Sequence, residues 1–142
     1  MNGSKYRQAF EQILARNNTV SPRKHPAEVE HHIQCACVRW FCYQHPEYKG
    51  CLFSVPNGGR RDKVTAAKLK AEGVVPGVSD LLFLVPNKKY HGLCIEMKDE
   101  KGRQSESQKE WQKTMVAMGY NYVVCRSLDD FIREVDGHLS NR

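Results

Sequence analysis

The most constraining feature of the sequence is a pair of apolar segments joined by a polar turn, with an acidic residue at each outer end. Residues 81–85 form a continuous apolar run, and a second segment extends from about residue 91 to residue 98. Residues 86–90 between them include a proline and an asparagine, which is typical of a turn. The pattern therefore predicts a β-hairpin whose first strand is buried on both faces.

The register of this hairpin brings the two acidic residues together. If Val85 pairs with His91, counting back along both strands places Asp80 directly opposite Glu96. Their β-carbons would then lie about 4.5–5.5 Å apart, and the alternation of side chains would place Glu96 and Lys98 on one face. Two facing carboxylates repel each other unless a cation lies between them, and a hard divalent ion with oxygen ligands suits that position.

The same residues also admit a purely structural reading. An aspartate often begins a strand, and a Glu-x-Lys sequence can face solvent without any role in chemistry. Two further features favour a site. Gly77 permits close approach of the backbone just before Asp80, and the net charge of +6 suits a polyanionic substrate.

Composition limits the class of protein. The chain has 142 residues, enough for one domain with a substantial core, and its 40% hydrophobic and 27% charged residues are ordinary for a globular protein. It shows no membrane-length apolar run and no secretory signal pattern, so we expect a soluble, cytoplasmic protein. The six cysteines include no Cys-x-x-Cys pair, so we expect small buried thiols in a reducing compartment.

Hydrophobic periodicity predicts a mixed α/β order of elements. Beyond the hairpin, helices are expected at residues 4–16, 28–41, 60–72, 105–118 and 128–138, strands at 50–55 and 120–125, and a turn at 57–59. Residues 17–26 contain two prolines and read as a linker. We therefore expect an N-terminal helix and linker over residues 1–26 and one globular domain over residues 27–142. The order predicts an α/β sandwich with a mixed sheet of four strands.

Five short motifs, taken together in this order and spacing, give the chain a family resemblance. They are Glu30-His31-His32-Ile33-Gln34, Asn57-Gly58-Gly59, Pro76-Gly77-Val78-Ser79-Asp80, Glu96-Met97-Lys98 and Ser105-Glu106-Ser107-Gln108. The chain resembles the VRR-NUC domain, a branch of the PD-(D/E)xK nucleases, in its compact stand-alone viral or bacterial form. The match covers residues 28–130 and implies a restriction-endonuclease-like α-β-β-β-α-β core, with the four-stranded mixed sheet flanked by helices.

The resemblance implies a metal-dependent nuclease site. Asp80 and Glu96 would bind Mg²⁺ or Mn²⁺ through carboxylate oxygens, and the carbonyl of Met97 would complete the protein ligands. Met97 stands where the family usually has valine, a change that leaves a backbone ligand in place. Lys98 would orient or deprotonate the attacking water, or stabilise charge on the phosphate. We expect no organic cofactor.

Two further residues of the motifs have competing readings. Glu30 would be an additional catalytic residue that binds the metal, through water or directly; Glu28 is its rival, and a solvated helix charge is the plain alternative. Gln108 either closes a capping box with Ser105 or points toward the catalytic Lys98, where the family places a glutamine.

A zinc site on the first core helix is disfavoured. His31, His32, Cys35 and Cys37 lie within two turns of one predicted helix, so they cannot all converge on a tetrahedral ion.

The remaining expectations concern the substrate. Asn57, Gly58 and several cations are expected to contact DNA phosphates, which position a duplex without reading its bases. These cations are Arg60, Arg61, Lys63, Lys68, Lys101 and Arg103. Most surface cations of any protein are simply solvated, which is the plain alternative here.

Stand-alone members of the family resemble Holliday-junction resolvases and form homodimers. The resemblance therefore implies an endonuclease that acts in DNA repair on branched or flapped DNA, in the cytoplasm of a bacterial or phage-infected cell. Residues 6–13 would supply part of the dimer interface, or would pack on their own core. The alternatives are a non-catalytic basic DNA-binding module on the same fold and a sequence-specific restriction-type endonuclease.

Overall fold

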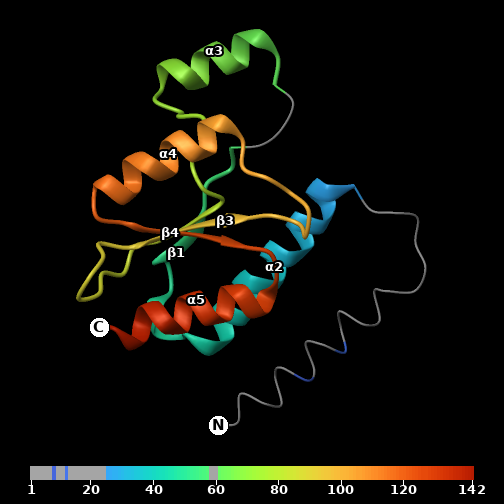
Figure 1. Ribbon diagram of the computed structural model, residues 1–142. Coiled ribbons are helices and arrows are strands. Elements are labelled where there is room, and N and C mark those ends of the chain that lie inside the picture. Colours follow the sequence, from blue (N-terminus) through green and yellow to red (C-terminus); the bar gives the residue numbers. More distant parts are fainter. Residues whose placement is uncertain (1–7, 9–11, 13–24, 58–60) are drawn as a thin grey trace.

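The computed structural model of the protein describes residues 8, 12, 25–57 and 61–142 (Figure 1). Its elements are α2 (Pro26–Gln44), the short 3-10 helix η1 (Pro46–Tyr48), β1 (Leu52–Ser54), α3 (Lys63–Ala71), β2 (Leu81–Phe83), β3 (Leu93–Met97), α4 (Glu106–Ala117), β4 (Asn121–Cys125) and α5 (Leu128–Ser140). The predicted N-terminal helix and most of the linker lie outside the described residues, and so do the predicted DNA contacts Gly58 and Arg60.

The four strands form one mixed sheet in the order β1-β2-β3-β4. The first two pairs of neighbours are antiparallel, and β3 runs parallel to β4. Leu81 pairs with Ile95 and Phe83 pairs with Leu93, which is the register that the sequence predicts. Continuing that register by one residue places Asp80 opposite Glu96. The predicted fold class, a mixed four-stranded sheet flanked by helices, is therefore confirmed.

The hairpin differs from the prediction in its length and in its exposed face. β2 has only three residues, and the segment between β2 and β3 is a long connection. Leu84 is 51% exposed, so the apolar run is not buried on both faces as expected. The Asn87 side chain organises the connection, because its Oδ1 accepts the Lys89 and Tyr90 N–H groups at 2.9 and 2.7 Å. Its Nδ2 donates to the carbonyl of His138 at 3.1 Å. These hydrogen bonds of the Asn87 side chain occur where the sequence predicts that backbone pairing between the two strands continues.

α2 begins two residues earlier and ends three residues later than predicted, for reasons that lie at its ends. The His25 ring accepts the Ala27 N–H at 3.3 Å, and Pro26 occupies the first helical position, where an N–H has no helical partner. At the other end, His45 precedes Pro46, and a residue before proline avoids the helical conformation. No helix in the described part of the chain is long and apolar enough to cross a membrane.

Helices cover both faces of the sheet (Figure 1). α2 and α5 pack together on one face and enclose the main core, which includes Cys37, Phe41, Leu81, Phe83, Ile95, Met97, Phe131 and Val135. α4 covers the opposite face, where the Trp111 ring meets the Tyr122 ring edge-on at 6.1 Å. Glu96 lies on this second face and is only 1% exposed. A carboxylate buried that deeply requires an explanation, since an unpaired buried charge is strongly destabilising.

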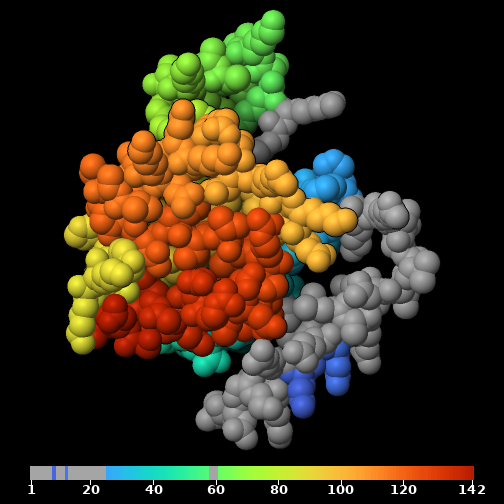
Figure 2. Space-filling model, in the orientation of Figure 1, coloured from blue at the N-terminus to red at the C-terminus, as the bar shows by residue number. Residues whose placement is uncertain are grey.

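α3 projects from the rest of the molecule as a separate lobe (Figure 2). Asp62 caps its first turn, accepting the Thr65 N–H at 2.8 Å. The helix ends at Ala71, and Gly73 follows its C-cap residue with a φ of 99°, the left-handed conformation that glycine commonly adopts just after a helix. No residue of α3 is buried, and Val64 is 80% exposed. Few packing contacts therefore hold this helix against the rest of the molecule.

Candidate active site

Asp80 and Glu96 converge at the open end of the hairpin. Asp80 Oδ2 accepts the Met97 N–H at 2.7 Å, which holds the aspartate against the end of β3. The pKa of Glu96 is raised to about 7, mainly by burial and then by the negative charge of Asp80 and a hydrogen-bonding contact between the two carboxyl groups. The ammonium of Lys98 acts in the opposite direction. The carboxyl groups are thus close enough to share a proton or a cation.

Polar side chains from three elements surround the Glu96 carboxylate. Lys98 Nζ lies 3.0 Å from Oε1, and Gln108 Nε2 donates to the same oxygen at 2.7 Å. The Tyr122 hydroxyl lies 3.5 Å from Oε2. Charged and short hydrogen bonds of this kind orient a carboxylate firmly. We refer to Asp80, Glu96, Met97, Lys98 and Gln108 as the acidic centre.

Gln108 makes both of the contacts that the sequence presents as alternatives. Its Oε1 accepts the Ser105 N–H at 2.9 Å, while its own N–H donates to Ser105 Oγ at 3.3 Å, which completes the capping box. Its Nε2 remains directed at Glu96. A side-chain amide has an acceptor and a donor on separate atoms, so one conformation serves both roles. The two roles are therefore compatible rather than exclusive.

The turn before Asp80 is built from backbone that only glycine permits. Gly77 has a φ of 82°, and a β-carbon added there would overlap the backbone carbonyl of Ser107 at the start of α4. Asn57 Nδ2 donates to the carbonyls of Val75 and Val78, each at 3.3 Å. The Asn57 amide nitrogen thus anchors this turn, whereas the sequence suggests a DNA contact for the residue.

Glu30 contacts the loop that follows Lys98. Its Oε1 accepts the Asp99 N–H at 3.2 Å. From the other side, Arg126 Nη1 donates to the carbonyls of Asp99 and Gly102 at 2.6 and 2.8 Å. Within residues 25–57 and 61–142, no three His, Cys, Asp or Glu side chains group as metal ligands. Glu30 therefore does not complete a three-carboxylate cluster with Asp80 and Glu96.

The donor set of the acidic centre nevertheless fits a hard divalent ion. Asp80 and Glu96 supply carboxylate oxygens whose mutual repulsion a cation would relieve. The Lys98 N–H donates to the Cys125 carbonyl of β4 at 3.0 Å. Because backbone groups of successive strand residues point to opposite edges, the Met97 carbonyl faces the Asp80 side. Two carboxylates and a carbonyl leave about half of the positions around an octahedral ion open to water or phosphate.

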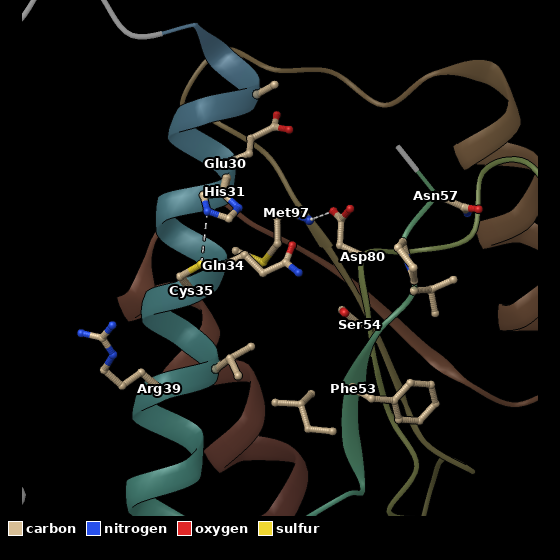
Figure 3. Close-up of a pocket in the computed structure, with 15 residues that line it drawn as sticks. Glu30, His31, Gln34, Cys35, Arg39, Phe53, Ser54, Asn57, Asp80 and Met97 are labelled. Atoms are coloured by element: carbon tan, nitrogen blue, oxygen red, sulfur yellow. Dashed lines mark hydrogen bonds between the residues drawn. The ribbon is translucent and has the colours of Figure 1, made fainter. Parts of the chain in front are cut away.

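A groove of about 730 Å³ leads away from the acidic centre between α2 and β1 (Figure 3). Asp80 and Met97 form one end of it, together with Glu30. The remaining lining comes mainly from successive turns of α2 and from residues 52–57. We call this feature the α2–β1 groove.

The structure separates the predicted cationic contacts into two groups. Lys101 and Arg103 lie on the loop between the acidic centre and α4. Lys63 and Lys68 lie on α3, beyond α4 from the sheet (Figure 1). Arg61 donates to the carbonyl of Pro56 at 3.3 Å, at the approach to α3. Of the two groups, only Lys101 and Arg103 lie close in sequence to Lys98 of the acidic centre.

Sequence reasoning does not identify several residues that support the site. Gln104 Nε2 donates to the Tyr122 hydroxyl at 3.2 Å and to Gln112 Oε1 at 2.9 Å. Burial raises the pKa of Tyr122, so its hydroxyl stays protonated as a donor. Tyr122 lies beside Cys94 through the parallel pairing of β3 and β4. A signal for these residues would require the parallel register, which a single sequence does not specify.

Comparison with known proteins gives a consistent family. The sequence model of the VRR-NUC domain matches residues 4–129 of this chain. A solved structure described as a VRR-NUC domain protein superposes with a TM-score of 0.69 at 26% sequence identity. The superposition covers 80% of this chain and 89% of that chain. Among curated proteins, none matches the sequence.

Proposed function

Because the chain belongs to the VRR-NUC domain family and has its nuclease-type fold, we propose that it is a metal-dependent DNA endonuclease that prefers branched or flapped DNA. The observation that carries the proposal is the Glu96 carboxylate. It is 1% exposed, it faces Asp80, and it is held by donors from Lys98 and Gln108. Lys98 supplies one positive charge beside these two carboxyl groups, and a divalent cation would balance the negative charge that remains.

Asp80, Glu96 and the carbonyl of Met97 would hold Mg²⁺ or Mn²⁺. A bound ion of this kind lowers the pKa of its water and neutralises charge on a phosphate. The protein positions the oxygen ligands. The Met97 N–H fixes one oxygen of Asp80, and Gln108 and Lys98 fix one oxygen of Glu96. Glu30 would act one step further out, through water or through the loop that it binds.

Lys98 is the residue that would act on the nucleophile and the phosphate. Its side chain is 11% exposed, and its ammonium lies 3.0 Å from Glu96. In that position it would orient the attacking water, and it would add positive charge where negative charge develops on the phosphate. In this arrangement hydrolysis would proceed by direct attack of water on the phosphate.

The surroundings of the acidic centre suit a DNA backbone. Lys101 and Arg103 follow Lys98 on an exposed loop, and the net charge of the whole chain is +6. Contacts to phosphates would weaken steeply with added salt and would not depend on base sequence. A homodimer would present two such centres for paired cuts across a junction.

The test is cleavage of end-labelled linear duplex, flap, splayed-arm and four-way junction DNA, with Mn²⁺ or with EDTA. We expect Mn²⁺-dependent cleavage that is strongest on the branched substrates and absent from a matched Asp80→Ala preparation. Equal cleavage in EDTA would show that the activity does not need a metal. Retained cleavage by Asp80→Ala would show that the acidic centre is not the active site. Cutting of plain duplex at one defined sequence would instead indicate a restriction-type enzyme.

A further inference from the structure

The α2–β1 groove gives the proposed nuclease a place for part of its substrate beyond the phosphate that is cut. Asp80 and Met97 close one end of the groove, so a strand held at the acidic centre would continue into it. The inference drawn here rests on the proposed function, because the acidic end of the groove is meaningful only if a phosphate binds there.

Three residues of α2 line the groove on one helical stripe. Glu30, Gln34 and Val38 recur every four residues and therefore share a face of the helix. Opposite them, Leu52 and Ser54 point from the same face of β1, since alternate strand residues share a face. The groove thus changes from acidic, through polar, to apolar with distance from the acidic centre.

Gln34 is the polar side chain in the middle of this stripe. It is half-buried, and Figure 3 shows it directed from α2 into the groove. Among the residues that the structure describes, none forms a hydrogen bond with its amide. The neighbouring polar groups differ, because Glu30 accepts the Asp99 N–H and Asn57 donates to two carbonyls. Gln34 therefore has a donor and an acceptor with which to bind a ligand.

The size of the groove favours a single strand over a double helix. Its volume of about 730 Å³ lies in the range of pockets that enclose small organic ligands. The stripe from Glu30 to Val38 extends about 12 Å along the helix, enough for about three stacked nucleotides of one strand. A pocket of this volume cannot enclose a duplex, whose major groove alone is about 12 Å wide and about 8.5 Å deep.

We propose that the α2–β1 groove binds unpaired DNA next to the phosphate that is cut. Its apolar end, between Val38 and Leu52, would take the face of a base, and Gln34 would bind the edge of that base. A substrate would then have to present an unpaired nucleotide at the cut site, as flaps, splayed arms and opened junctions do. The groove would supply the preference for branched DNA that the acidic centre alone cannot provide.

Two cysteines of α2, one inside the groove and one outside it, allow this proposal to be tested without measuring DNA cleavage. Cys35 and Cys42 are both exposed on α2, but only Cys35 lines the α2–β1 groove. Burial raises the pKa of Cys37, Cys94 and Cys125, so these thiols react slowly. Alkylation by N-ethylmaleimide, followed for each peptide by mass spectrometry, then reports occupancy of the groove.

The experiment uses the full chain in EDTA with oligothymidine or with a blunt duplex of the same length. At an oligothymidine concentration ten times its Kd, we expect Cys35 alkylation to slow about tenfold. We expect Cys42 alkylation to stay constant, and we expect the duplex to leave both rates unchanged. Equal protection of Cys35 by the duplex, or no protection by the single strand, would overturn the proposal.

A matched pair of variants tests the role of Gln34. Gln34→Leu should weaken oligothymidine binding about tenfold through the lost hydrogen bonds. Gln44→Leu, at the exposed end of the same helix, should change it by less than about twofold. Equal affinities of the two variants would contradict a base contact at Gln34.

The results separate this inference from the proposed function. Lys98→Ala should lose cleavage yet keep the protection of Cys35, because Lys98 does not line the groove and the protection is measured without metal. Branched-DNA cleavage by a wild-type protein whose Cys35 is never protected would reject the groove and leave the nuclease proposal intact. Protection without any cleavage would reject the nuclease proposal alone.

Discussion

The acidic centre and α3 show two opposite ways of holding charged residues. Glu96 is 1% exposed and contacts charged or polar side chains from β3, α4 and β4, whereas no residue of α3 is buried. In the acidic centre, one substitution changes packing, hydrogen bonding and charge together. On α3, a lysine can be replaced while the fold is left as it was. The protein thus couples stability to its proposed chemistry and separates stability from its expected phosphate contacts.

The largest effect expected in the acidic centre is the loss of cleavage. Asp80→Ala should reduce cleavage of branched DNA by at least about a thousandfold, since it removes a metal ligand. DNA affinity measured in EDTA should change by less than about threefold. Lys98→Ala should behave similarly, because it removes the cation beside the proposed nucleophile. A parallel loss of DNA binding in either variant would show that the acidic centre shapes the binding surface as well.

Glu96→Gln should separate stability from chemistry. The pKa of Glu96 is about 7 in the folded protein, above its ordinary value of 4.5. The folded state therefore holds a proton that the unfolded chain releases between pH 4.5 and 7, so the free energy of unfolding falls as the pH rises through this window. At pH 8 in EDTA, the free energy of unfolding of Glu96→Gln should exceed that of the wild type by up to about 3 kcal/mol. The variant should not cleave DNA when metal is added.

Urea denaturation at pH 4.5 and pH 8 measures this difference. The gain should fall to a few tenths of a kcal/mol at pH 4.5, where Glu96 is protonated in the folded wild type. Glu106→Gln is the matched control, since Glu106 is 85% exposed in α4 and should change the stability by less than about 0.5 kcal/mol. Equal stability of Glu96→Gln and the wild type at pH 8 would show that Lys98 compensates the buried charge fully.

Two substitutions of Gln108 should show how much its contact with Ser105 and its contact with Glu96 each contribute to stability. Gln108→Ala removes the capping box and the Glu96 contact. It should lower the free energy of unfolding by about 1 kcal/mol at pH 8 and should also reduce cleavage. Gln108→Glu keeps an acceptor for the Ser105 N–H but adds a negative charge beside Glu96. Thermal melting should therefore show Gln108→Glu destabilised at pH 8 and recovering at pH 5. A pH-independent loss would indicate that the cap alone is affected.

The smallest effect on stability is expected on α3. The double variant Lys63→Gln and Lys68→Gln should leave the unfolding free energy within about 0.5 kcal/mol of the wild type. If both lysines contact phosphates, the salt dependence of duplex binding, measured by fluorescence anisotropy, should fall by about 0.9 per lysine in logarithmic slope. An unchanged slope would show that α3 is merely a solvated helix.

Short-range patterns predicted much of the fold. The hairpin register was predicted correctly, and the capping box at Ser105 was one of the two roles predicted for Gln108, because each depends on residues close together in the chain. The ends of α2 were misplaced because the helix extends beyond its apolar stripe, between the cap at His25 and the proline at residue 46. The exposure of Leu84 was missed because β2 ends after three residues and the Asn87 side chain organises the connection beyond it.

The sequence alone determined that Asp80 and Glu96 face each other, since both lie on one hairpin whose register follows from its turn and apolar pattern. The tertiary structure decided what surrounds them. The Tyr122 contact depends on the parallel pairing with β4, the Glu30 contact with the Asp99 backbone depends on the packing of α2, and the α2–β1 groove depends on both of its walls. These contacts join residues far apart in the chain, and only the packing of helices on both faces of the sheet brings them within hydrogen-bonding distance.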